Sequence, residues 1–243
     1  MLRSLLLAAP VSLALFGAAA AAPVSGPGAL TGIWLLDQRT YDSQGETTPP
    51  LTEAVKAKAE AARKATAEGG VVLSDNNKKC LPIGMPGLVT NEFALEFLET
   101  PGKVTVISEN SPLVRTLSLT RKAHDFDQEP SWNGDSIAHW EGATLVVETA
   151  NLNDRISHIP AARGFTSLTT RIEERYHLED AGKTLVNRMT FTDPNVLTKP
   201  WSVTYKYHRG EPGAELWEYV CEVDAPGWSE RFAGDPEFKK PGL

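Results

Sequence analysis

Apolar and polar residues alternate along most of the chain with a period of two, the pattern of strands half buried in a sheet. Short, turn-like connections such as Pro101-Gly102 separate these segments. Successive strands with short connections form an antiparallel meander, and a long meander tends to close into a barrel. The predicted fold class is therefore all-β with one helix, an antiparallel meander closing into a β-barrel. Its strands, about ten, are expected at Thr31–Gln38, Glu92–Glu99, Lys103–Glu109, Leu113–Thr120, Asp135–Glu141, Ala143–Thr149, Leu168–Glu179, Thr184–Thr192, Trp201–His208 and Glu215–Val223.

One segment, Thr52–Glu68, breaks the alternation and has the features of a helix. Thr52 suits the N-cap, Glu53 suits the first turn, and Gly69-Gly70 ends the segment. Its apolar residues are mostly alanines, so the stripe that it can bury is thin. We expect a lid or a surface brace rather than a core helix.

The N-terminus has the pattern of a secretory signal peptide. Arg3 precedes an apolar run from Leu5 to Phe16, and small residues follow as far as Ala22. This run is too short and too rich in alanine to be a good bilayer span. We expect residues 1–22 to be removed, residues 23–223 to form one β-barrel domain, and residues 224–243 to be an irregular tail. The expected location is the periplasm or the cell exterior.

Charge and cysteine content narrow the partners and support this location. The formal net charge is −7 and no basic cluster occurs, which argues against nucleic acid as a partner. No segment after the signal is apolar enough to suggest membrane insertion. The two cysteines, Cys80 and Cys221, are expected to form a disulfide in an oxidising compartment. Two buried free thiols are the alternative. The sequence leaves the oligomeric state open.

Three blocks of sequence carry a resemblance to a known family. They are Cys80–Pro86 (CLPIGMP), Pro130–Thr149 (PSWNGDSIAHWEGATLVVET) and Glu218–Cys221 (EYVC). The chain resembles a family of exported bacterial proteins with a lipocalin-like β-barrel. The resemblance implies a fold and a compartment and supplies no reaction. The family commonly has a histidine where this chain has Asp135, so no histidine-based role is transferred.

Two charged residues interrupt strand faces that are otherwise apolar. Arg115 shares a face with Leu113 and Leu117, and Glu174 shares one with Ile172 and Tyr176. A buried arginine or glutamate is costly unless it is paired and hydrogen-bonded. We therefore expect these two residues to pair in or near the barrel lumen. A structural ion pair and a functional pair that lines a pocket both remain open.

A second set of residues could line a ligand pocket. Trp201, Tyr205 and Tyr207 alternate along one strand, and such a stripe is either core or the aromatic wall of a pocket. Asn187 lies on an apolar strand face, and Trp140 belongs to the central block of the resemblance. These five residues are the candidate ligand-binding set.

The loops offer little for catalysis or metal binding. His124, Asp154 and His158 lie in two long connections, Arg121–Gly134 and Ala150–Ser167, and of these three residues His124 is the candidate third member of a catalytic set with Arg115 and Glu174. Asp125 and Asp127 resemble the start of a calcium loop, but Pro130 stands where glycine is needed. No metal or organic cofactor is expected, and Ser136 lacks the glycine elbow of a serine nucleophile.

Three functional hypotheses follow from these residues. The first is an exported barrel that binds a small, largely apolar molecule in its lumen. The second is a cofactor-independent acid/base enzyme of the lyase, isomerase or hydratase type that acts on a small molecule in the same cavity. The third is an interaction protein of the cell envelope. The first two predict convergence of the candidate residues on one cavity.

Overall fold

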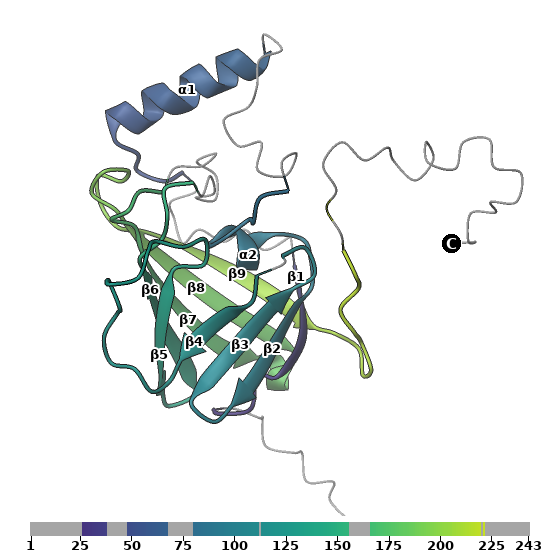
Figure 1. Cartoon of the computed structure of the whole chain (residues 1–243). Coiled ribbons are helices and arrows are strands. Elements are labelled where there is room, and N and C mark those ends of the chain that lie inside the picture. Colours follow the sequence, from purple (N-terminus) through teal and green to yellow (C-terminus); the bar gives the residue numbers. More distant parts are fainter. Residues whose placement is uncertain are drawn as a thin grey trace, which may run out of the picture.

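A closed barrel of nine strands forms the body of the protein (Figure 1). The computed structural model describes residues 26–37, 48–67, 80–111, 113–155, 166–219 and 221. Within these residues the strands are β1 (Gly32–Leu36), β2 (Leu95–Thr100), β3 (Lys103–Ser108), β4 (Arg115–Ser118), β5 (Asp135–Glu141), β6 (Thr144–Ala150), β7 (Arg171–Glu179), β8 (Thr184–Thr192) and β9 (Trp201–Arg209). Each strand pairs with the next one along the chain, and β9 pairs with β1. The predicted fold class is confirmed.

One pair of neighbouring strands runs parallel. In a ring of strands whose directions alternate, an odd number cannot close with every pair antiparallel. Here β9 and β1 are antiparallel, and the mismatch falls between β4 and β5. A parallel pair needs a crossover connection of about a dozen residues or more, and residues 119–134 provide it. The first of the two long loops that the sequence indicated is this crossover.

Large side chains occupy the inside of the barrel. Inward residues recur at every second position along β7, β8 and β9, and nearly all of them are buried. Phe97 packs edge-on against Tyr176 with ring centroids 5.4 Å apart, and Phe191 stacks on Trp201 at 5.7 Å. A barrel of about eight strands is just wide enough for side chains to fill it. The candidate aromatic wall therefore belongs to a packed core.

Arg209 fastens one end of the barrel. Its guanidinium lies over the Trp34 ring, 4.1 Å from the ring centroid, and donates hydrogen bonds to the carbonyls of Thr31, Ala29 and Gly182. Burial lowers the pKa of Arg209, yet three carbonyls and an aromatic face compensate the charge. This contact ties the start of β1 to the end of β9.

The short helix α2 (Gly87–Thr90) covers the opposite end (Figure 1). Leu88 and Val89 are fully buried there, and the Val89 carbonyl accepts a 2.6 Å hydrogen bond from the Tyr207 hydroxyl. The segment before α2 is held by the Met85 N–H, which donates to the Trp132 carbonyl at 2.9 Å. Two of the sequence blocks that carry the family resemblance therefore meet at this end.

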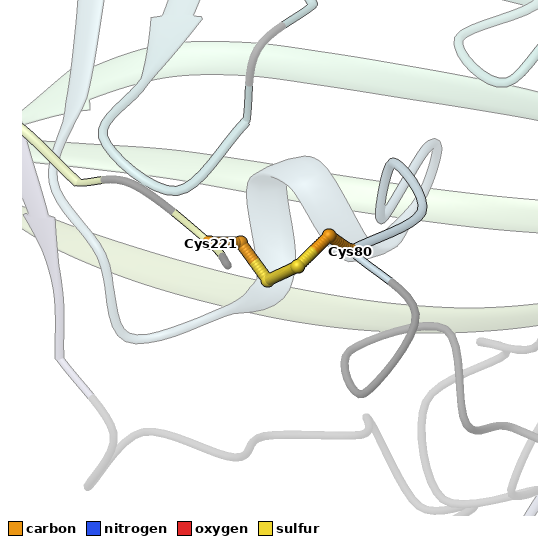
Figure 2. Close-up of a disulfide and its surroundings, with 2 residues drawn as sticks. All are labelled: Cys80 and Cys221. Atoms are coloured by element: carbon orange, nitrogen blue, oxygen red, sulfur yellow. A yellow bond between two sulfur atoms is a disulfide. The ribbon is translucent and has the colours of Figure 1, made fainter. Parts of the chain in front are cut away.

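The third block is joined to the first by a disulfide. Cys80 and Cys221 are bonded across a sequence separation of 141 residues (Figure 2), which confirms the predicted pairing. Near it, the rings of Phe93 and Tyr219 lie 5.3 Å apart, and the backbone N–H of Trp217 donates to the Glu109 carboxylate. The bridge thus fixes the C-terminal segment to the end of the barrel that α2 covers.

The longer helix α1 (Glu53–Ala67) lies beyond this same end (Figure 1). Val55 and Ala59 are buried, whereas Lys56 and Lys58 are exposed. The chain before it is anchored by the Thr52 N–H, which donates to the Val196 carbonyl. The helix prediction is confirmed, with a thin buried stripe. No helix in the described ranges is both long and apolar enough to cross a bilayer.

One predicted strand is wrong. The expected strand was Glu215–Val223. The structure describes residues 210–219, which include the first five residues of this segment, and none of residues 210–219 is in a strand. The ring is already closed by β9 and β1, so no open sheet edge is left for another strand. The predicted signal peptide and C-terminal tail lie outside the described residues.

Replacing both cysteines by serine should destabilise the protein. Loss of a native disulfide typically costs ~2–5 kcal/mol, and long loops favour the upper part of this range. Denaturant unfolding of Cys80→Ser/Cys221→Ser and of the wild type, both without reductant, measures the difference. Wild type treated with reductant should shift toward the double variant. Equal midpoints for all three samples would contradict a stabilising bridge.

Candidate functional site

A buried ion pair crosses the interior of the barrel. Arg115 at the start of β4 is 1% exposed and Glu174 in the middle of β7 is fully buried. One guanidinium nitrogen, Nη1, donates to Glu174 Oε1 at 3.2 Å, and Nη2 contacts Oε2. The two residues therefore face the interior and pair, as the sequence predicted.

Hydroxyl and amide groups from neighbouring strands surround this pair. Arg115 Nη2 also donates to Thr149 Oγ1 at 2.8 Å and to Ser136 Oγ at 3.3 Å. On the other side, the Tyr176 hydroxyl donates to Glu174 Oε1 at 2.6 Å, and Asn187 Nδ2 does so at 3.4 Å. We call these six residues the buried polar cluster: Arg115, Ser136, Thr149, Glu174, Tyr176 and Asn187. Five consecutive strands, β4 to β8, contribute to it.

Burial and charge shift the protonation equilibria of the cluster. Desolvation alone would lower the pKa of Arg115, but the Glu174 carboxylate outweighs it and the pKa is raised. Burial raises the pKa of the Tyr176 phenol well above its usual value, and the negative charge of Glu174 adds to this. Burial also raises the pKa of Tyr207. The guanidinium and both phenols therefore stay protonated in the folded state at neutral pH.

A cleft opens on the barrel wall beside the buried polar cluster. It has a volume of about 800 Å³ and follows the junction of β4 and β5, which we call the seam. Only two residue pairs are in register across the seam, against nine between β7 and β8. Arg115 and Ser136 lie at the floor of the cleft because they are almost fully buried and yet line it. Among the other lining residues are Lys103, Leu113, Val114, Thr116, Arg121, Trp132 and Asn133.

Three of the five candidate ligand-binding residues share one rung of the barrel. Trp140 on β5 is in register with Leu145 on β6, and Leu145 is in register with Tyr176 on β7. Tyr176 is in register with Asn187 on β8, and Asn187 with Tyr205 on β9. Directly opposed residues point to the same face of a sheet, here the interior. Asn187 Oδ1 and Trp140 Nε1 are buried without a hydrogen-bond partner in the described part of the chain. Trp201 and Tyr207 are also buried, in the packed core.

His124 lies apart from the ion pair. Its Nδ1 is 3.0 Å from Asp135 Oδ2, and Arg121 binds the other oxygen of this carboxylate. Asp135 precedes Ser136 along β5, and successive strand residues point to opposite faces. The predicted catalytic set of Arg115, Glu174 and His124 is therefore not assembled: the first two are inside the barrel wall and His124 is outside it. Of the other loop candidates, Asp154 is exposed and forms no hydrogen bond or ion pair with Arg115 or Glu174 in the described ranges, and His158 lies outside the described residues.

The cluster of Arg121, His124 and Asp135 holds the crossover against β5. Burial alone would raise the pKa of Asp135, but hydrogen bonds from Arg121 and His124 and from the Asp125 N–H outweigh it, so the pKa is lowered. The carboxylate is thus ionised at neutral pH and binds the loop by charge. Its role is to fix one wall of the cleft.

The sequence did not reveal the hydroxyl partners or the seam. Ser136 and Thr149 are small polar residues at inward strand positions, and this was the one sequence signal that could have identified them as partners of the ion pair. Their hydroxyls lie 2.9 Å apart. The cleft depends on which strands are neighbours and on how far they separate. Alternation along single strands carries no information on either.

No protein-family model matches the chain, and no curated protein sequence does. Its fold is similar to solved barrels at low sequence identity. A structure titled REP1-NXSQ fatty acid transporter is 9% identical, with 75% of this chain and 97% of that one covered and a TM-score of 0.37. An SAHS protein from Ramazzottius varieornatus is 12% identical, with 78% of this chain and 100% of that one covered and a TM-score of 0.37. A Schistosoma mansoni fatty acid binding protein in complex with arachidonic acid is also 12% identical, with 76% of this chain and 98% of that one covered and a TM-score of 0.37. At these TM-scores the similarity carries no argument about a ligand.

Arg115 and Glu174 should behave as one energetic unit. Removing one partner of a buried pair typically costs ~3–5 kcal/mol because the other charge is left uncompensated. The double replacement Arg115→Met/Glu174→Leu should therefore cost less than the sum of the two single replacements. Denaturant unfolding of the four proteins measures the coupling free energy. Additivity within about 0.5 kcal/mol would show that the two side chains do not interact.

Alkaline pH should destabilise the fold through its buried tyrosines. The pKa values of Tyr176 and Tyr207 are raised by folding, so their contribution is fully present below the unfolded phenol pKa of about 10 and is lost as the pH rises above it. In an absorbance titration at tyrosinate wavelengths, these phenols should ionise only as circular dichroism reports unfolding. Replacement of both by Phe should flatten the fall in unfolding free energy above about pH 10. Complete tyrosine ionisation of the folded protein would contradict this.

Proposed function

We propose that the protein is an exported small-molecule binding protein whose ligand site is the cleft at the seam. One observation carries the proposal: the cleft, about 800 Å³ in volume, has Arg115 and Ser136 of the buried polar cluster at its floor. Small-molecule sites usually have ~300–1,000 Å³ and a few convergent polar groups in a mostly apolar lining. The cleft has this size, and polar groups of Arg115 and Ser136 converge at its floor.

The lining supports a ligand with a largely apolar body. Leu113, Val114 and Trp132 provide apolar surface, and Val114 is 55% exposed although it is a large apolar residue.

Binding is favoured over acid/base catalysis by the state of Glu174. Both of its oxygens accept hydrogen bonds from Arg115, and one also accepts from Tyr176. A general base must reach the proton that it abstracts, and Glu174 is fully buried and separated from the cleft by Arg115. We therefore do not propose a catalytic role for the pair.

Export is the second part of the proposal. The N-terminal pattern of Arg3, an apolar run and small residues up to Ala22 is typical of a cleaved signal peptide. The disulfide between Cys80 and Cys221 supports it, since such bonds persist mainly in oxidising compartments. The site would then face molecules of the periplasm or the cell exterior.

Native mass spectrometry of protein purified from the periplasm of an exporting bacterium tests both parts. The mass should correspond to a chain that begins at Ala21 or Pro23, and a fraction should carry a small-molecule adduct. Thr116→Trp, on the exposed face of β4 within the cleft, should lose the adduct because the indole fills the cleft. Thr204→Trp on β9, outside the cleft, is the matched control and should retain it.

Three outcomes would contradict parts of the proposal. An adduct that survives Thr116→Trp at the wild-type level would place the ligand elsewhere. If the purified protein carries no adduct and also binds none of a panel of amphipathic probes, the binding function is contradicted. A full-length chain retained in the cytoplasm would contradict export alone.

A further inference from the structure

We propose that the ligand of the cleft carries an anionic group, such as a carboxylate, sulfate or phosphate, bound at the Lys103 end of the seam. This inference rests on the proposed function and names the chemical class of its ligand. The apolar part of the ligand then lies at the other end of β4, against Leu113 and Val114.

The charge of the lining is opposite to that of the protein. The chain has 31 acidic and 24 basic residues, a formal net charge of −7. The residues that line the cleft include three cations, Lys103, Arg115 and Arg121, and a single carboxylate, Asp135. An excess of one sign of charge in a hollow favours ligands of the other sign. An anion therefore meets a locally favourable potential in a protein that otherwise repels it.

The three cations differ in how far other groups neutralise them. Arg115 is compensated by Glu174 on the interior side, and Arg121 by Asp135. Lys103 is exposed, and its side chain has neither a hydrogen bond nor an ion pair within the described ranges. The ammonium group of Lys103 is thus the cation of the cleft that can accept an anion without losing an existing partner.

Hydroxyl groups next to Lys103 complete the anion site. Lys103 begins β3 and lies opposite Ser118 on β4. The hydroxyls of Ser118 and Thr120 are 3.5 Å apart, and both residues line the cleft together with Arg121. Hydroxyls donate to anionic oxygens, and charge-assisted bonds of this kind are stronger than neutral ones. Leu113 and Val114 lie beyond the other end of β4, so the large aliphatic side chains of the cleft are at the end away from Lys103.

Calorimetric titration with three ten-carbon probes tests the inference: decanoate, decanol and decyltrimethylammonium. Decanoate should bind roughly tenfold more tightly than decanol, and the cation should bind most weakly. Added salt should weaken decanoate binding and leave decanol unchanged, since screening acts on charges. Lys103→Glu should weaken decanoate binding roughly three- to tenfold, the size expected when an exposed attraction becomes a repulsion. Its effect on decanol should stay within about twofold.

The control is Lys58→Glu on the exposed face of α1, which makes the same change in net charge away from the cleft. It should change decanoate binding by less than about twofold. Equal affinity for decanoate and decanol, or equal effects of the two lysine variants, would overturn the anion site and leave the proposed binding function standing. Binding of none of the three probes would overturn both.

Discussion

Nine strands cannot close a ring without one parallel pair, and this constraint organises the rest of the molecule. The chain places the parallel pair between β4 and β5, where only two residue pairs are in register. It must then return along the barrel wall through the crossover, which Asp135 holds through Arg121 and His124. The cleft, with Arg115, Arg121 and the exposed Val114 in its lining, lies at this one interruption of the ladder.

The buried polar cluster lies directly behind the interruption. Where two strands separate, inward side chains lose the neighbour that a continuous ladder would supply, and a polar group can be reached from outside. Arg115 spans this position and links the hydroxyls of β5 and β6 to the carboxylate on β7. A buried ion pair is weak evidence for stability. The pair keeps the interior polar behind the seam, while Arg209 and Trp34 hold the far end of the barrel together.

Strands and the ion pair were predictable from the sequence because both follow from alternation along single segments. Arg115 and Glu174 each interrupt an apolar face, and burial required them to pair. The seam was not predicted because the sequence indicated about ten strands. An even number of strands can close with every pair antiparallel, whereas the nine observed strands cannot. Residues 215–219 include the aromatic residues Trp217 and Tyr219, a residue type that favours strands, but find no edge to join. His124 was misplaced because positions in a loop do not follow the period of a strand.

The disulfide also determines how the molecule responds to a cut in its backbone. Cys80 and Cys221 enclose β2 to β9 in one covalent loop, and β1 precedes it. A protease that cleaves a single connection within this loop therefore leaves one molecule, whose two pieces remain linked at the end that α2 covers. β1 lies outside the loop and is retained by three residue pairs on each side and by Arg209. Among the nine described strands, β1 is thus the one that a single cut can release.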